Sequence, residues 1–176
     1  MSKAVMISIR PKWCEKICDG EKTVEVRKTR PKLETPFKCY IYCTAERVGY
    51  EELWVLDAPS REKYLITAVC AYLQRAEGAS KGNRKVIGEF TCDRIYELAP
   101  LNHAPDDAEK QACLTREEIV NYLKGTGYGW HITDLRIYDQ PRELSEFTGL
   151  RNTRFGAAPY DIKRPPQSWC YVEEQK

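Results

Sequence analysis

The stretch that decides the fold covers residues 4–27 and reads AVMISIRPKWCEKICDGEKTVEVR. Its first six residues are mostly apolar, which predicts a buried strand that ends before Pro11. Pro11 suits the first position of a helix, and Gly20 suits the position just past the end of that helix. Residues 23–28 then alternate between polar and apolar side chains, as strands do. The order strand, helix, strand therefore opens the chain.

Three charged residues lie close together after this helix: Lys22, Glu25 and Arg27. By alternation, Glu25 and Arg27 share one strand face, and Val24 and Val26 share the other. One interpretation is a solvated outer face with a weak surface ion pair. The other is a functional site, in which Glu25 orients or deprotonates Lys22 and Arg27 holds an anionic or carbonyl group.

Length and composition indicate one domain, residues 1–176, that can bury a sizeable core. No apolar run is as long as a membrane span, and the N-terminal residues lack a signal-peptide pattern. We therefore expect a cytoplasmic protein with no membrane partner. The sequence contains no phosphate-binding loop, dinucleotide fingerprint, zincin motif or nucleophile elbow, which argues against those enzyme classes.

The net charge is only +2, but the basic residues are unevenly distributed. Residues 1–43 contain ten Lys or Arg and five Asp or Glu. A second basic cluster consists of Arg151, Arg154, Lys163 and Arg164. If the two regions meet in space, they form one basic face, and the second cluster is a candidate for salt-sensitive phosphate contacts. The alternative is that both regions serve only solubility.

Two pairs among the eight cysteines have C-x3-C spacing: Cys14 with Cys18, and Cys39 with Cys43. This spacing raises the hypothesis of a zinc site, but it differs from standard finger patterns. Each pair shares one face of its predicted helix or strand, where a free cysteine packs as a small apolar residue. We expect these cysteines in the core, and we expect no metal ion and no cofactor.

Several short strands follow residue 37. The predicted strands are residues 38–43, 85–95, 130–138 and 167–172. Gly88 is a candidate bulge within the second of these. Thr115 and Glu118 have capping-box spacing, which predicts a helix from there to about Leu123.

The remaining segments complete the predicted fold class. Residues 99–113 form a polar connection, and residues 44–84 form a helical insertion. Parallel βαβ alternation is not evident, and helices occur only at connections. We therefore predict an α+β fold, a small β-barrel decorated by a few helices.

Further candidates for a ligand site are aromatic or basic. Tyr128, Trp130 and His131 follow a glycine-rich turn, and aromatic side chains beside basic ones can stack a nucleobase. Trp130 and His131 face opposite ways by alternation, so at most one of them faces a common site, and the alternative for Trp130 is the core. His131 could carry a proton at neutral pH. Arg10, at a strand end before a proline, either binds a phosphate or is an ordinary surface residue.

The residues around the first helix also resemble a known family. The sequence SIRP at residues 8–11, a short helix, and the pattern GxKxxExR at residues 20–27 are similar to the signature of the ASCH domain, within the PUA-like superfamily. The chain is similar to the phage- and prophage-type members of this family. The resemblance covers about residues 3–43, 85–95 and 128–173.

This resemblance implies a PUA-like barrel with a cleft between the first helix and the sheet, lined by the motif side chains. Family members bind RNA or nucleosides; one branch hydrolyses the amide of an acylated cytidine, and another is a ribonuclease. In the amidohydrolase branch the motif Lys acts with a Thr three residues later and with a Glu elsewhere. Lys22 matches that Lys, but position 25 is Glu25. The second acidic residue would fall near Glu109, Glu117 or Glu118.

Three functions are open on this basis. The first is a binding module that captures RNA or a modified nucleoside at Lys22, Glu25 and Arg27. The second is a metal-independent hydrolase of an acylated base or an RNA phosphodiester, with Lys22 as base or nucleophile and Glu25 as proton shuttle. The third is a protein–protein adaptor that uses Trp54 and the amphipathic helix of the insertion at 44–84.

Overall fold

The computed structural model describes residues 2–45, 84–98 and 104–175. Almost the whole predicted insertion at 44–84, and with it the surface of the adaptor hypothesis, lies outside these residues. In the part of the chain that is described, no helix is long and apolar enough to cross a membrane.

Strands dominate the described residues. The strands are β1 (Lys3–Ile9), β2 (Val24–Arg27), β3 (Phe37–Cys43), β4 (Val86–Cys92), β5 (Ile95–Glu97), β6 (Tyr128–His131), β7 (Thr133–Arg142), β8 (Thr148–Thr153), β9 (Gly156–Asp161) and β10 (Trp169–Glu173). The helices are α1 (Pro11–Cys18), α3 (Ala108–Ala112) and α4 (Arg116–Leu123), and a 3-10 turn covers Leu144–Glu146.

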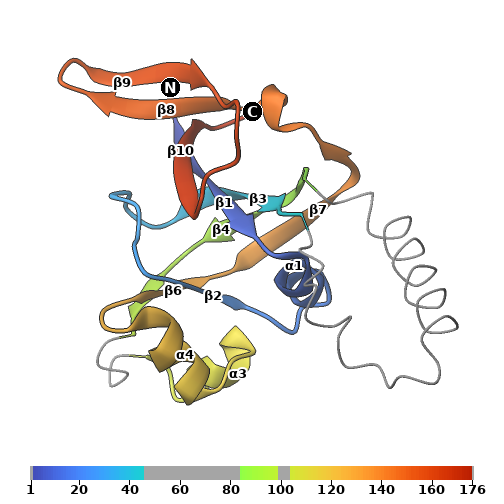
Figure 1. Ribbon diagram of the computed structural model, residues 1–176, viewed down its shortest axis with the longest axis vertical. Helices are drawn as coiled ribbons and strands as arrows, with labels where there is room; N and C mark the ends of the chain where they lie inside the picture. Colours follow the sequence, from blue (N-terminus) through green and yellow to red (C-terminus); the bar gives the residue numbers. More distant parts are fainter. Residues whose placement is uncertain (1, 46–83, 99–103, 176) are drawn as a thin grey trace, which may run out of the picture.

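The strands form two sheets (Figure 1). The larger sheet has the order β7-β4-β3-β1-β10-β8-β9, and the smaller has the order β2-β6-β5. The predicted α+β class is confirmed. The predicted barrel is not closed, because the pairings among the described strands give two separate sheets. The physical reason is that β2 pairs with β6 instead of joining β1.

Parallel βαβ alternation is not evident in the sequence, but the structure contains one parallel strand pair with a helix in its connection. β1 and β3 pair in parallel, with Val5 opposite Cys39, and α1 lies in the connection between them. The connection also contains β2, which leaves for the smaller sheet. This extra strand hides the simple βαβ alternation in the sequence.

β1 forms the centre of the core because it is buried on both faces. Val5, Ile7 and Ile9 pack in a cluster with side chains of α1, β3, β4 and β6. Ala4 and Met6 pack in a second cluster with residues of β3 and β10 and with others before and after the β8–β9 hairpin. Both clusters gain the free energy of burying apolar surface, about 25 cal/mol per Å².

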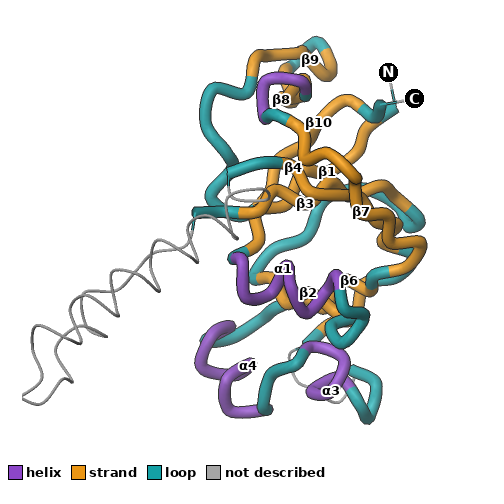
Figure 2. The backbone as a smooth tube through the Cα atoms, turned by 90° about the vertical axis from the view of Figure 1, so that its right-hand side faces the viewer, coloured by secondary structure: helices purple, strands orange, loops and turns teal. Residues whose placement is uncertain are grey.

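The smaller sheet lies between the larger sheet and helices α3 and α4 (Figures 1 and 2). A third apolar cluster joins these helices to the smaller sheet through Val26, Leu98, Ala112, Ile119 and Leu123. The β8–β9 hairpin and both chain termini lie at the opposite end of the molecule. The motif strand β2 is therefore enclosed between two layers.

One local signal in the sequence is confirmed, and a second lies close to its predicted position. The capping box of α4 is present: Glu118 N donates to Thr115 Oγ1 at 3.2 Å, and Thr115 N donates to Glu118 Oε2 at 2.7 Å. The irregularity predicted at Gly88 lies next to it, because the register of β4 shifts between Val86 and Gly88 against both β3 and β7. A Cβ at Gly88 would lie 2.5 Å from Arg136 O, so this position requires glycine.

Other segments divide differently from the prediction. The predicted strand at 85–95 is two strands, β4 and β5, which belong to different sheets, and the strand at 130–138 is likewise β6 and β7. The polar connection at 99–113 contains α3. The β8–β9 hairpin was not predicted, because most of its side chains are exposed and leave no alternating apolar pattern.

Candidate functional site

The motif begins where α1 ends. Gly20 has φ +74°, a left-handed conformation that lets the chain reverse. Lys22 N then donates to Lys16 O at 2.9 Å, and Thr23 N donates to Gln111 O at 2.9 Å. These bonds fix the start of the motif against both α1 and α3.

The three charged side chains of the motif form a buried chain of ion pairs, called here the buried ion chain. Lys22 Nζ lies 3.4 Å from Glu25 Oε2, and Glu25 Oε1 lies 2.9 Å from Arg27 Nη2. Lys22 is 2% exposed, Glu25 6% and Arg27 7%. The solvated outer face that alternation allowed is therefore wrong. Glu25 pairs across the sheet with Trp130, a core residue, so its face turns inward.

Lys22 is held by three groups. Its Nζ donates to Ala112 O at 2.7 Å and lies 5.0 Å from the centroid of the Trp13 ring. Together with Glu25, these contacts fix the position of the Lys22 side chain. The acceptor at Ala112 comes from α3, within the segment that the sequence indicated only as a polar connection.

Arg27 joins the buried ion chain to β1 and to the segment before β10. Its Nη2 donates to Ser8 O at 2.7 Å, and its Nη1 lies 3.4 Å from Ser168 Oγ. Ser8 Oγ in turn donates to Pro166 O at 2.6 Å. Residues distant in sequence thus form the wall around the guanidinium.

Two atoms of the buried ion chain make no hydrogen bond among the described residues: Arg27 Nε, and Glu25 Oε2, whose one contact to a charged group is the 3.4 Å ion pair with Lys22. Buried polar atoms are nearly always paired, because an unpaired one loses its bond to water without replacement. Glu25 Oε2 is an acceptor and Arg27 Nε is a donor. An acceptor and a donor on adjacent side chains can together bind a ligand that carries both kinds of group.

Solved structures with this architecture are known. The ASCH protein of Zymomonas mobilis is 17% identical, with a TM-score of 0.50 over 97% of this chain and 88% of that one. One mutant of that protein, also 17% identical, gives a TM-score of 0.51 over 98% of this chain and 92% of its own. A second mutant, again 17% identical, gives a TM-score of 0.50 over 97% of this chain and 89% of its own. The chain has an ASCH fold. No protein-family model matches the sequence, and no curated protein matches it significantly.

The ASCH resemblance predicts a cleft between the first helix and the sheet, lined by the motif side chains. Trp13 of α1 does lie against the motif, but the three motif side chains are buried. Two cavities on the described surface are lined by other residues. The motif side chains are therefore almost fully buried, and the cleft that they would line stays a prediction.

One of these cavities adjoins the motif and is called here the basic groove. It is formed by residues 28–35, which follow β2, together with Ile95, Thr126 and Tyr128. Of the sequence-predicted ligand residues it contains Tyr128, whose ring centroid lies 5.5 Å from Arg30 Cζ. The basic residues of the groove were missed. The signal that could have found them is a basic residue at every second position from 28 to 32.

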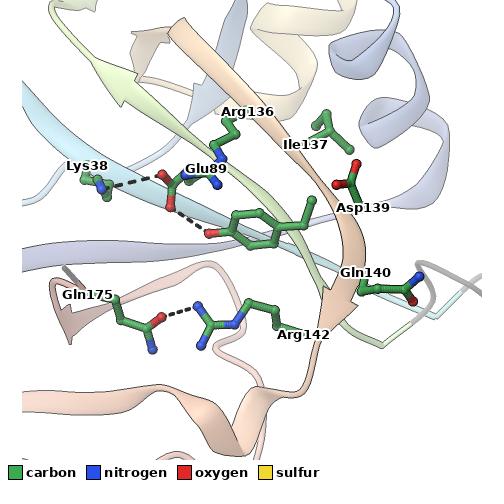
Figure 3. A pocket seen from close by; sticks show the side chains of 9 residues that line it. Lys38, Glu89, Arg136, Ile137, Asp139, Gln140, Arg142 and Gln175 are labelled. Carbon is green, nitrogen blue, oxygen red and sulfur yellow. Dashed lines mark hydrogen bonds and ion pairs between the residues drawn. The ribbon is translucent and has the colours of Figure 1, made fainter.

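The other cavity lies at the β7 edge of the larger sheet (Figure 3). Tyr138 Oη donates to Glu89 Oε2 at 2.7 Å, Lys38 Nζ lies 3.5 Å from Glu89 Oε1, and Arg142 donates to Gln175. Burial, followed by the bond to Glu89, raises the pKa of Tyr138 above its usual range. These groups bind one another, so the network stabilises the sheet edge.

Trp130 and Arg10 have different environments. Trp130 is fully buried, with ring centroids 5.9 Å from Phe37 and 6.0 Å from Trp169. It offers no exposed ring face to a base, and the core interpretation holds for it. Arg10 is exposed at the N-terminus of α1 with the extended backbone expected before a proline. Its phosphate role stays a prediction.

His131 lies on the face of β6 opposite to Trp130. Its Nδ1 lies 2.6 Å from Asp93 Oδ1, and its ring meets that of Tyr96 at 6.2 Å between centroids. Desolvation raises the pKa of Asp93, but the hydrogen bond and charge of His131 outweigh it, and the net shift is downward. His131 belongs to this separate pair, away from the buried ion chain.

The second basic cluster is exposed and divides between two segments. Arg151 and Arg154 belong to the β8–β9 hairpin, whereas Lys163 and Arg164 follow β9. Arg154 Cζ lies 4.6 Å from the ring centroid of Phe155, which is 86% exposed. The hairpin lies at the end of the molecule away from β2 and β6 (Figure 1). A phosphate role for this cluster stays a prediction.

The acidic candidates from the family pattern are exposed. Glu109, Glu117 and Glu118 all lie on the surface, and Glu118 is engaged in the capping box of α4. The carboxylate that contacts Lys22 in the described residues is Glu25.

The cysteines pack mainly as apolar residues. Cys14, Cys39 and Cys43 lie in the core, as predicted, but Cys18 is exposed at the last position of α1. Burial raises the pKa of Cys39 well above its usual range, which keeps the thiol neutral. The described residues contain no group of three or more His, Cys, Asp or Glu arranged to hold a metal ion.

Proposed function

We propose that this protein binds RNA or a modified nucleoside, and that the buried ion chain recognises the nucleobase. The observation that carries the proposal is a pair of atoms that make no hydrogen bond, Glu25 Oε2 and Arg27 Nε, inside a row of buried charges. Burying three charges has a desolvation penalty that is rarely recovered in stability alone. A role in ligand recognition accounts for that penalty.

The chemistry of the two atoms supports a nucleobase as the ligand. Glu25 Oε2 can accept from an exocyclic amino group, and Arg27 Nε can donate to a ring nitrogen or a carbonyl oxygen. Nucleobase edges place such donors and acceptors side by side. The ASCH fold of the solved neighbours, and the resemblance of residues 20–27 to the ASCH motif, support the same ligand class.

We expect the ligand to approach beside Ser168. This residue is only half-buried, and its Oγ lies 3.4 Å from Arg27 Nη1. A base that displaces this long contact loses little, because a hydrogen bond at that distance is weak. Ser168 is therefore the wall residue at which we expect the ligand to enter.

A hydrolase is the second candidate, and the contact between Lys22 and Glu25 favours it. A buried Lys–Glu pair is the arrangement that proton transfer from an amine requires. The bond from Lys22 Nζ to Ala112 O and the Trp13 ring weigh against it, because an attacking amine would have to give up these contacts. Binding without turnover is therefore the first proposal.

Isothermal titration calorimetry with nucleosides, N-acylated cytidine and short RNAs tests binding. We expect saturable binding that weakens at least about tenfold in Glu25→Gln, the typical loss for a charge-assisted hydrogen bond. Arg27→Lys, which keeps the charge but lacks Nε, should weaken it similarly. Glu21→Gln, an exposed neighbour, is the matched control and should bind as the wild type.

The same samples distinguish the two candidates. Chromatography of N-acylated cytidine and RNA after incubation should show unchanged ligand if the protein only binds. Product formation that is lost in Lys22→Met would favour the hydrolase. Equal affinity in the wild type, Glu25→Gln and Arg27→Lys would show that the buried ion chain is not the recognition site.

A further inference from the structure

Tyr128 links the basic groove to the face of β2 that carries the buried ion chain. Arg27 of β2 lies directly opposite Tyr128 of β6, so the two side chains share one face of the smaller sheet. Tyr128 is half-buried and forms part of the groove wall. A ligand bound beside Arg27 could therefore extend past Tyr128 into the groove.

The charge of the groove favours an anion. Lys28, Arg30 and Lys32 are all exposed on the segment that follows β2, and Glu34 is the one acidic residue of residues 28–35. These three basic residues fall within five positions and all line the groove, so positive charge is concentrated there. The groove thus offers a row of cations to a polyanion.

Aromatic rings lie beside these cations. Arg30 Cζ lies 5.5 Å from the ring centroid of Tyr128, and Lys28 Nζ lies 5.3 Å from that of Tyr122. Both rings are at least partly exposed. Cations interleaved with rings on which bases can stack are the two elements of single-strand recognition.

The segment that carries the cations is anchored. Lys32 N donates to Tyr171 Oη at 2.7 Å, and Trp169 Nε1 donates to Thr29 Oγ1 at 3.0 Å. Pro31, between them, is buried. Because β10 anchors this segment at Thr29 and Lys32, less backbone entropy remains to be lost on binding.

We propose that the basic groove binds a single-stranded nucleic acid, with phosphates on Lys28, Arg30 and Lys32 and one base stacked on Tyr128. This inference rests on the proposed function, because it extends the ligand from the nucleobase at the buried ion chain to the strand that follows it. The groove selects a single strand because bases within a duplex are already stacked on one another and cannot reach Tyr128.

Fluorescence anisotropy with a labelled octauridylate tests the groove across 50–200 mM salt. The variant Lys28→Ser/Arg30→Ser/Lys32→Ser should lose at least about tenfold in affinity at low salt. Its log K should also fall less steeply with log salt concentration, with the magnitude of the slope smaller by about 2 because three phosphate contacts are lost. Tyr128→Leu should lose about tenfold at every salt concentration with the slope unchanged, because stacking involves no released counterion.

The matched control is Arg84→Ser/Lys85→Ser/Arg136→Ser, which removes the same charge from β4, β7 and the residues beside them. It should bind octauridylate within about twofold of the wild type, and circular dichroism should confirm that every variant is folded. The proposal that the groove binds the strand is overturned if this control loses as much affinity as the groove variant. It is also overturned if the groove variant keeps the affinity and the salt slope of the wild type. Nucleoside binding is measured separately, so strand binding at the groove can be disproved while nucleobase recognition at the buried ion chain is retained. A wild type that binds neither nucleosides nor octauridylate overturns both.

Discussion

At the scale of single residues, Glu25 is the buried acidic member of the buried ion chain. It lies between two buried cations, Lys22 and Arg27, and is itself 6% exposed. Neutralising one member of a buried ion pair leaves the partner charge uncompensated, which is far more costly than losing the pair as a whole. The exposed pair Lys16–Glu21 has a shorter contact, 2.6 Å, but water screens it.

We therefore expect Glu25→Gln to lower the free energy of unfolding by about 3 kcal/mol, because two buried cations lose their counterion. Glu21→Gln, at the surface, should lower it by less than about 1 kcal/mol. Urea unfolding followed by circular dichroism measures both, with the midpoint shifting and the slope unchanged. Similar midpoints for the two variants would contradict the burial argument.

Asp93 provides a prediction about pH. Its pKa is lower in the folded protein, because the hydrogen bond and charge of His131 outweigh the opposing desolvation. A carboxyl with a lowered folded pKa contributes stability that is complete above its unfolded pKa, about 3.9, and is lost as pH falls through the folded value. Asp93→Asn should remove this contribution.

The check is urea unfolding at pH 5 and pH 2.5. Wild type should lose more stability than Asp93→Asn between these two values, since only the wild type has this carboxyl to protonate. Parallel losses in the two proteins would mean that the Asp93–His131 contact does not contribute to folding.

At the scale of elements, local signals worked where a helix or strand is specified by its own residues. The capping box at Thr115 and Glu118 predicted α4, and the helix is present with both reciprocal bonds. Pro11 and Gly20 marked the ends of α1 in the same way. Such signals succeed because the hydrogen bonds that they form join residues within a single turn.

Thr115→Ala should lower the free energy of unfolding by about 1 kcal/mol, because Glu118 N loses its acceptor. Thr115→Ser keeps an acceptor at the same place and should be nearly neutral. Thermal or urea unfolding compares the two. If Ser destabilises as much as Ala, the cap is not the source of the effect.

Strand boundaries were harder to predict from sequence, and β4 and β5 show why. Residues 85–95 have the composition of one strand, but β4 pairs with β3 and β7, whereas β5 pairs with β6 in the other sheet. The break at residues 93–94 depends on which partner each half finds. A strand carries no local signal for its partner, because its hydrogen bonds are made to another segment.

At the scale of the whole molecule, β1 lies at the centre of the larger sheet, with β3 on one side and β10 on the other. The β8–β9 hairpin lies at one edge, and the side chains from Arg151 to Phe155 are all exposed. Buried, fully paired strands open only with the whole domain, whereas an exposed hairpin tip opens by itself.

Hydrogen exchange followed by mass spectrometry should therefore give the slowest amides in β1 and β3 and fast exchange at residues 151–156. The protection in β1 should fall in Glu25→Gln by the same factor as the unfolding equilibrium, since its opening requires global unfolding. Slow exchange at 151–156 would indicate that another surface covers the hairpin.

The sequence by itself determined the α+β class, the start and end of α1, the cap of α4, the irregularity next to Gly88 and the motif residues. These features depend on neighbours in the chain or on an invariant steric requirement. Only the tertiary structure decided that β2 leaves β1 for a second sheet and that the motif charges are buried. It also brought Ala112, Ser8 and Ser168 to them. The reason is physical: burial and long-range pairing depend on which segments meet, and alternation in β2 is equally compatible with either face turned inward.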